Sequence, residues 1–237
     1  MEANNHIPCR ADPDVWMREA RKFDGTDYYE YMLLYVDYCL AISETPKEAV
    51  LKLDQFFKMQ PNSIAPPSIY LVGKLKKTRL PNTVEAWIFS SSQYVQEAVS
   101  NVVKFLQDLY GYMLSTKINA PLSNDYRPEL DSSPELDGAD GAYYQSLIGI
   151  IHWMVKLGRV DICCEVSMMS SHLALPREGH LAQVFHILAY LKTHHNPSLV
   201  FDPSYPNVNI DKFLKYDWKF FYVYVKEAMP LICHSLW

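Results

Sequence analysis

Two apolar runs separated by a short turn constrain this chain more than any other part of its sequence. The first run extends from Tyr31 to Val36 and the second from Cys39 to Ile42, with Asp37 and Tyr38 between them. Runs of this length and composition, broken by a turn, predict the two strands of a β-hairpin. The sequence therefore predicts a buried hairpin that carries an acidic residue, Asp37, at its tip.

The composition predicts a globular chain that remains in a reducing compartment. Of its 237 residues, 49% are hydrophobic and 21% are charged, which excludes a disordered chain. No apolar run approaches the roughly 18 residues that cross a bilayer, and the first residues do not form a secretory signal. The five cysteines are an odd number without metal-ligand spacing, so we expect structural thiols and an intracellular, cytoplasmic protein without a membrane partner.

The elements expected along the chain change from strands to helices. Thr45, Pro46 and Glu48 predict a capped helix start, and a stripe from Ala49 to Phe57 continues that helix. Residues 69–75 and 84–89 are expected to form two strands joined around residues 80–83, followed by a helix at 92–107. A Gly-, Pro- and Ser-rich linker comes next, and then three helical patterns that we expect to pack as an antiparallel bundle.

One strand of the expected pair is rich in basic residues. Lys74, Lys76, Lys77 and Arg79 lie within six positions, although the whole chain has a net charge of −5. A basic strand is a candidate nucleic-acid-binding surface, because phosphate contacts supply most of the affinity for nucleic acids. A charged strand edge that resists pairing with other chains explains the same four residues equally well.

Eight short strings occur in order along residues 11–192. The strings are Ala11-Asp12-Pro13-Asp14-Val15-Trp16, Leu33-Leu34-Tyr35-Val36-Asp37, Ile69-Tyr70-Leu71-Val72-Gly73, Ser92-Gln93-Tyr94-Val95, Tyr144-Gln145-Ser146-Leu147-Ile148-Gly149, Arg159-Val160-Asp161-Ile162, Pro176 with His180, and Leu188-Ala189-Tyr190-Leu191-Lys192. Together they resemble the reverse transcriptase of copia-type long-terminal-repeat retrotransposons. Pro121-Leu122 lies where the family has a similar short motif. Each string alone is weak, and their shared order carries the resemblance.

The resemblance implies an α+β fold with a partial palm, an antiparallel sheet with a flanking helix, followed by a helical thumb and connection region. The expected divisions are a palm at 1–90 with the hairpin and the strand pair, a thumb-like helix at 91–108, a linker at 109–142, a connection-like bundle at 143–194 and an irregular tail at 195–237. The family's fingers and first palm half are expected to lie upstream of this chain, and its ribonuclease H domain has no counterpart.

The resemblance also implies a chemistry that this chain supports only in part. The family adds nucleotides with two Mg²⁺ ions, held by one upstream aspartate and by two at the hairpin. Asp37 keeps the first hairpin position as a catalytic and metal-binding residue, and Tyr38 replaces the second. A phenol with a reference pKa of about 10 is a poor Mg²⁺ ligand at neutral pH. Asp37 is equally explained as an Asp favoured at a turn because it bonds its own backbone.

The sequence thus predicts an RNA-directed DNA polymerase fragment of a retrotransposon polyprotein that is inactive as this chain. An RNA template and a DNA primer are the partners that the family implies, in a virus-like particle. The missing palm half would come from the rest of a polyprotein or from a partner chain, and the sequence leaves both open. Two alternatives stay open. One is a non-catalytic nucleic-acid-binding module, and the other is a decayed fragment without a selected function.

Overall fold

The computed structural model describes residues 4–204, apart from residues 57, 61, 112 and 117. It divides into two compact units, one formed by Met1–Pro66 with Ser204–Trp237 and the other by Pro67–Pro203. We call them the first and the second unit. The described residues form two antiparallel four-stranded sheets and five α-helices, so the expected mixture of sheet and helix is confirmed. Residues 205–237 of the predicted tail lie outside the description.

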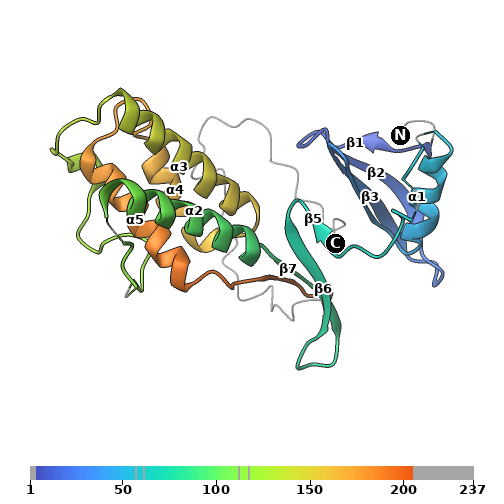
Figure 1. Ribbon diagram of the computed structural model, residues 1–237. Helices are drawn as coiled ribbons and strands as arrows, with labels where there is room; N and C mark the ends of the chain where they lie inside the picture. Colours follow the sequence, from blue (N-terminus) through green and yellow to red (C-terminus); the bar gives the residue numbers. More distant parts are fainter. Residues whose placement is uncertain (1–3, 57, 61, 112, 117, 205–237) are drawn as a thin grey trace, which may run out of the picture. The chain divides into compact units, whose positions relative to one another are not determined.

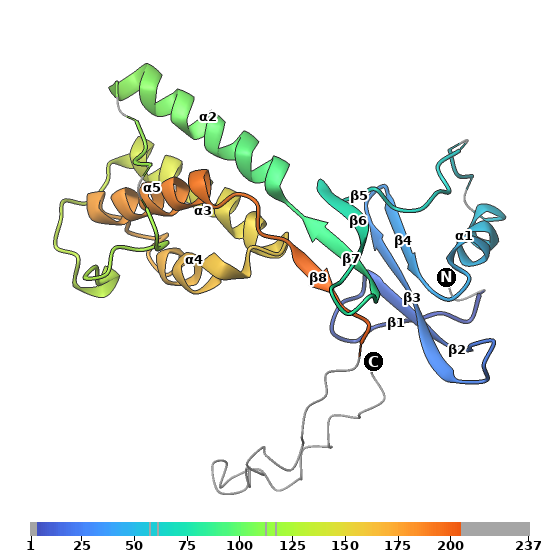
Figure 2. The same ribbon diagram turned by 90° about the horizontal axis from the view of Figure 1, so that it is seen from below.

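The first unit is a sheet with one helix. Its strands are β1 (Ile7–Pro8), β2 (Val15–Arg21), β3 (Asp27–Tyr35) and β4 (Tyr38–Ile42), paired in that order, and its helix is α1 (Pro46–Asp54). Tyr35 pairs with Tyr38, which leaves a two-residue turn between β3 and β4. The predicted hairpin is therefore present, and Figure 1 and Figure 2 show α1 beside the sheet.

The core of the first unit is small. Met32 of β3 packs with Ala49 and Leu53 of α1, and these are its buried apolar side chains. Elsewhere the hairpin is only half-buried, and Tyr35 and Tyr38 are 40% and 42% exposed, so the prediction of a buried hairpin is wrong at the tip. The difference arises because a single short helix covers few of the alternating side chains of a sheet.

Helix α1 begins where the sequence predicts but without the predicted capping box. Thr45 precedes it without a side-chain cap, and the hydroxyl of Ser43 instead accepts the backbone N–H of Thr45. Phe56 lies beyond the helix and is exposed. The stripe of the helix is therefore shorter than the sequence pattern suggests.

A buried polar network stabilises the first unit beside this core. Glu30 of β3 is 4% exposed, and its carboxylate accepts hydrogen bonds from Arg18, Tyr28 and Ser43. Burial alone would raise the pKa of Glu30, but the bonds from Ser43 and Arg18 outweigh it and lower the pKa. A buried carboxylate with this many donors remains charged and fixes the register of the strands that supply them.

The second unit opens with a sheet whose turns use residues other than glycine. Its strands are β5 (Ile69–Tyr70), β6 (Gly73–Arg79), β7 (Glu85–Ser90) and β8 (Leu199–Phe201), paired in that order. The expected strand at 69–75 is instead a tight hairpin, in which Leu71 and Val72 both have positive φ. Gly73, the next residue, does not reduce the conformational strain of that turn. An added Cβ there would lie 2.1 Å from the ring of Phe89, so the glycine makes room for packing.

Four helices form the rest of the second unit. They are α2 (Ser92–Tyr110), α3 (Gly138–Lys156), α4 (Cys163–Ser170) and α5 (Glu178–Thr193), as Figure 1 shows. Their inward faces share one core, which includes Val99, Ile151 and Leu188. The bundle that the helical patterns predict is present, and it also contains α2, which the sequence separates from it by a linker.

The expected divisions of the chain therefore differ from the compact units. The N-terminal segment of the first unit ends at Pro66, whereas the predicted palm runs to residue 90 and includes the β6–β7 pair. The segment 109–142 connects helices of one core, contains the short 3₁₀ helix Pro128–Leu130 and gives way to α3 at Gly138. The prediction of an irregular tail is wrong at Leu199–Phe201, because these residues form strand β8 and pair with β7 (Figure 2).

A buried ion pair holds the turn between α3 and α4. Arg159 is 1% exposed, and its Nε and Nη2 atoms donate to the two carboxylate oxygens of Asp161 at 2.8 Å and 2.6 Å. Burial would raise the pKa of Asp161, but the bonds and the charge of Arg159 lower it.

Within the described part of the chain, no helix is long and apolar enough to cross a membrane.

Candidate functional site

The turn of the β3–β4 hairpin presents Asp37 at an exposed tip. Val36 and Asp37 are its two central residues, and Val36 adopts a φ of 49° while 88% of its surface is exposed. A β-branched residue in the left-handed region is strained, and such strain concentrates at functional sites. The turn that carries Asp37 therefore has a conformational cost, which arises at Val36.

The side chain of Asp37 does not behave like the other turn residues of the chain. Asp12, Asp24 and Asn82 each accept the backbone N–H two residues further on, at 3.0, 2.8 and 3.2 Å. Within the described residues, the Asp37 carboxylate accepts no such bond. Among the described residues, Asp37 thus lacks the backbone bond by which an Asp stabilises its own turn, and the residue is exposed.

Tyr38 directly follows Asp37 in the hairpin. It is the first residue of β4 and pairs with Tyr35 across the turn, so two phenol side chains flank the tip. Since Tyr35 and Tyr38 are each about two-fifths exposed, the tip has an aromatic surface beside a single carboxylate. Position 38 holds a phenol and not a carboxylate, and it lies directly across the turn from Tyr35.

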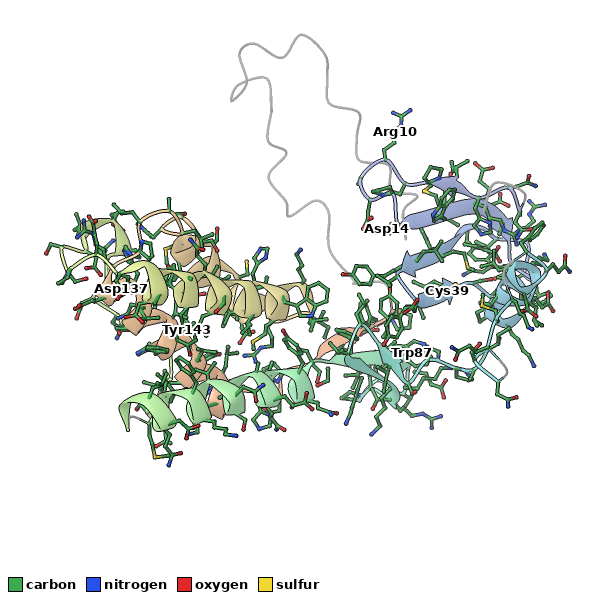
Figure 3. All side chains as sticks on the ribbon, turned by 45° about the horizontal axis from the view of Figure 1, so that its top comes forward. Arg10, Asp14, Cys39, Trp87, Asp137 and Tyr143 are labelled. Carbon is green, nitrogen blue, oxygen red and sulfur yellow. The ribbon has the colours of Figure 1, made fainter. Side chains whose placement is uncertain are left out.

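Two further acidic residues lie at the same end of the sheet. The backbone carbonyl of Asp14 accepts the N–H of Leu34, which places Asp14 beside the end of β3, just before β2 (Figure 3). Asp12 uses its carboxylate to accept the N–H of Asp14. The sequence analysis names neither as a site residue, although their position in the Asp-Pro string was a usable signal.

The residues around Asp37 do not fit a site for two Mg²⁺ ions. Among the residues that the structure describes, no three His, Cys, Asp or Glu side chains form a group that could hold a metal. Two Mg²⁺ ions require several oxygen ligands in near-octahedral geometry, and one carboxylate beside a phenol does not provide them. We therefore derive no metal-dependent step from this hairpin.

The four basic residues of the predicted nucleic-acid surface do not share a face. Successive side chains of a strand point to opposite faces, so Lys74 and Lys76 lie on one face of β6, and Lys77 and Arg79 on the other. Their cross-strand partners follow the same rule, with Ser90 opposite Lys74. The single basic surface expected from the sequence is thus split in two.

On the face with Lys77 and Arg79, each charged side chain has a partner on β7. The Lys77 ammonium lies 5.4 Å from the ring centre of Trp87 on β7, which Figure 3 labels. Arg79 lies 4.0 Å from the Glu85 carboxylate in an exposed ion pair. Beyond Leu75, the outer side of β6 has no strand partner among the described residues, as expected for a charged edge that resists further pairing.

The face with Lys74 borders a polar hollow. Its lining residues come from β6, β7 and the first turns of α2: Lys74, Ser90, Ser92, Gln93, Gln96 and Glu97. His195, which follows α5, adds a ring nitrogen 2.8 Å from the Ser92 hydroxyl and 2.8 Å from the Gln96 amide. Gln93 donates to the Glu97 carboxylate at 2.9 Å, and Glu97 is the one acidic residue of the lining.

The residues that line this hollow lie between positions 74 and 97, and His195 contacts two of them from about a hundred positions further along the chain. The Ser-Gln-x-Tyr string marks Ser92 and Gln93 in the sequence, and strand alternation would have placed Ser90 opposite Lys74. Nothing local points to His195, because its place depends on the return of the chain after α5. The hollow offers hydroxyl, amide and ammonium donors, which suit an anionic ligand such as a phosphate.

His180 and His186 contact backbone groups of other segments. His180 is 2% exposed, accepts the N–H of Arg177 at Nδ1 and lies 3.1 Å from the Pro128 carbonyl at Nε2. His186 lies 3.1 Å from the carbonyl of Ala120. These contacts tie the 109–137 segment to α5, which gives both rings a structural role.

Comparisons with known proteins do not identify a relative of this chain. No protein-family model, no curated protein and no solved structure matches it.

Proposed function

We propose that the chain is a palm and thumb–connection fragment of a copia-type reverse transcriptase that does not add nucleotides by itself. The observation that carries this proposal is the β3–β4 hairpin, whose two-residue turn presents Asp37 at an exposed tip. Strand β2 begins at Val15, within the Asp-Pro string, and pairs with β3 of that hairpin, in the order that the resemblance implies. The strand pair β6–β7 and helix α2 then follow in the family's order.

The absence of activity follows from the ligands at the hairpin. Two-metal catalysis needs carboxylates that bridge or flank the ions, and Tyr38 offers a neutral hydroxyl where the family has a carboxylate. Further carboxylates would have to come from a longer polyprotein or from a partner chain. In this proposal the setting is intracellular, in the virus-like particle of the family.

Primer extension tests this proposal. The chain, its Tyr38→Asp variant and its Tyr38→Phe variant are each incubated with an RNA template, a DNA primer, all four nucleotides and Mg²⁺. We expect no extension by the unchanged chain or by Tyr38→Phe, which keeps the ring and removes the hydroxyl. Extension by the unchanged chain would overturn the proposal. A fusion of each version to the family's upstream palm should be active only with aspartate at position 38.

A second candidate function is binding of a template–primer duplex without catalysis. The observation that favours it is the polar hollow beside Lys74, because hydroxyl and amide donors next to an ammonium group can bind a phosphate. Lys76 lies on the same face, so two cations could contact successive phosphates. The net charge of −5 limits such binding to low salt.

Fluorescence anisotropy with a labelled RNA–DNA duplex tests this second function. We expect binding at low salt that weakens when Lys74 and Lys76 become alanine, with a salt slope smaller by about one for each lost phosphate contact. The matched control replaces Lys77 and Arg79 on the opposite face and should change binding much less. Equal losses from both pairs would point to a diffuse charge effect, and no binding at low salt would leave only descent without retained function.

A further inference from the structure

A row of polar side chains crosses the whole sheet of the first unit. The pairing of β1 with β2, continued by one position before Ile7, places His6 opposite Arg18. Arg18 pairs in turn with Glu30 of β3. The pairing of β3 with β4, continued by one position after β4, places Ser43 opposite Glu30. Residues directly opposite each other in an antiparallel sheet point to the same face, so these four side chains are neighbours.

His6 is the member of this row that is buried without a partner. It is 3% exposed, and neither Nδ1 nor Nε2 has a hydrogen-bond partner among the described residues. Glu30, by contrast, accepts three hydrogen bonds. A protonated imidazole donates from both nitrogens and accepts from neither, so protonation of His6 would bury a charge without an acceptor.

The charges beside His6 make protonation still less favourable. Among the described residues these charges are Arg18 and Glu30, and Arg18 already pairs with the Glu30 carboxylate. An imidazolium at His6 would therefore be a second cation next to Arg18. Burial, followed by the charge of Arg18, lowers the pKa of His6, and the opposing effect of Glu30 is smaller. The folded segment thus favours the neutral ring.

The segment that carries His6 is attached to the sheet over a short length. Strand β1 has two residues and lies at the edge of the sheet, and its Ile7 is 60% exposed. A side-chain bond also holds the segment, in which Nη1 of Arg18 donates to the carbonyl of Asn4 at 3.3 Å. The three bonds to Glu30 come from residues outside this segment. The segment can therefore separate while the rest of the row stays bonded.

We propose that His6 is an acid-sensitive switch: when its ring takes up a proton, residues 4–8 separate from β2 and leave the edge of that strand open. In the separated segment the ring binds a proton near its ordinary pKa of about 6.5, and in the attached segment only at lower pH. The attachment is therefore complete above that pH and weakens as the pH falls below it. This switch is independent of the proposed function.

Hydrogen exchange of the full chain, corrected for the intrinsic pH dependence of amide exchange, tests the proposal. Between pH 7.5 and pH 5.0 we expect the amides that join β1 and β2 to open more often, by at most about thirtyfold. That limit is the ratio of protonated to neutral ring at pH 5.0 for an ordinary histidine. Strand β4, which pairs with β3, should keep its protection. Equal opening of β4 would overturn the proposal, because the whole unit would then unfold.

Two histidine variants and one titration complete the test. His6→Phe keeps a ring without titrating nitrogens and should abolish the pH dependence, whereas the same change at the exposed His152 of α3 should leave it intact. The proposal fails if His6→Phe opens with pH as the unchanged chain does. Titration of the His6 ring in the unchanged chain by NMR needs no variant. Its midpoint should lie below about 6.5, and a midpoint at or above that value would overturn the proposal.

Discussion

The two units of this chain reach a stable fold in different ways. In the second unit, nineteen buried apolar side chains from four helices and their connections form one core. Among the described residues of the first unit, three buried apolar side chains lie between a four-stranded sheet and one short helix, beside the polar network around Glu30. The second unit therefore depends on packing, and the first on strand pairing and hydrogen bonds.

This difference bears on function. A unit with a large core tolerates surface changes. The second unit can therefore keep its fold whether or not the hairpin of the first unit has a function. The first unit carries the candidate active-site turn but has little packing to stabilise it. We therefore expect the same kind of substitution to have different consequences in the two units, and the following predictions test that expectation.

The largest effect should come from the buried ion pair of the second unit. Asp161→Asn removes the charge that compensates Arg159, and loss of one partner of a buried pair typically costs about 3–5 kcal/mol. Since Asp161 is 30% exposed, we expect about 3 kcal/mol. Urea denaturation gives the free energy of unfolding, and hydrogen exchange shows which unit is affected.

The matched control for the ion pair is the double variant Arg159→Met with Asp161→Asn. It removes the buried charge together with its partner, so most of the lost stability should return. A double variant as unstable as Asp161→Asn alone would show that the pair matters for its shape rather than for its charge.

Identical methionine truncations should separate the two cores. Met154 of α3 and Met32 of β3 are 0% and 1% exposed. Met154→Ala should cost about 2.5–3 kcal/mol because the surrounding helices cannot close the cavity, and Met32→Ala about 2 kcal/mol because a single helix can move inward. Chemical denaturation of each variant measures both values. A larger loss at Met32 would contradict the contrast between the units.

The second unit should also lose stability at low pH through one carboxylate. Burial would raise the pKa of Asp131, but bonds from Ser133 and Tyr126 lower it to about 2. The unfolded chain binds this proton near pH 3.9, so the contribution is present above that pH and is lost as the pH falls toward 2. Solvent screening limits the contribution to about 1–2 kcal/mol.

Acid denaturation of the chain and of Asp131→Asn checks this window. The variant should be less stable at neutral pH, and its stability should change less between pH 4 and pH 2. If both proteins followed the same curve, another group would have to carry the acid sensitivity.

The smallest effects should be gains in stability at strained turns. Val36 of the first unit and Val72 of the second have φ values of 49° and 62°. Such a conformation costs about 1–2 kcal/mol for a residue other than glycine, and the entropy of glycine offsets part of that. Val36→Gly and Val72→Gly should each raise the free energy of unfolding by about 0.5–1 kcal/mol. Thermal denaturation measures both, and a loss would show that the valine side chains make contacts that matter.

The sequence predicts the local elements of this fold well where side-chain periodicity is strong. The hairpin around Asp37, the start of α1 at Pro46, the β6–β7 pair and the helices of the bundle all follow from patterns of apolar residues. The two-residue turn at Leu71-Val72 was not predictable in the same way, because neither residue favours positive φ. Strand β8 was missed since its pairing with β7 depends on the fold of the whole second unit.

The candidate site shows the same limit. Asp37 could be placed at a turn from the sequence, but its lack of a backbone bond could not. The basic strand was recognisable from its residues, although strand alternation, which divides Lys74 from Lys77, was not applied to it. His195 reaches Ser92 only through the folded chain, so no local pattern could have indicated it.

The binding of Mn²⁺ as a probe for Mg²⁺ tests the central claim most directly, namely that the hairpin keeps one carboxylate of a metal site and not the site itself. Titration of the full chain, followed by electron paramagnetic resonance, should show weak binding that Asp37→Asn reduces. Tyr38→Asp should tighten it roughly thirtyfold, because a second carboxylate adds about 2 kcal/mol of attraction to a divalent ion at an exposed site. Tight binding of two ions by the unchanged chain would contradict the account.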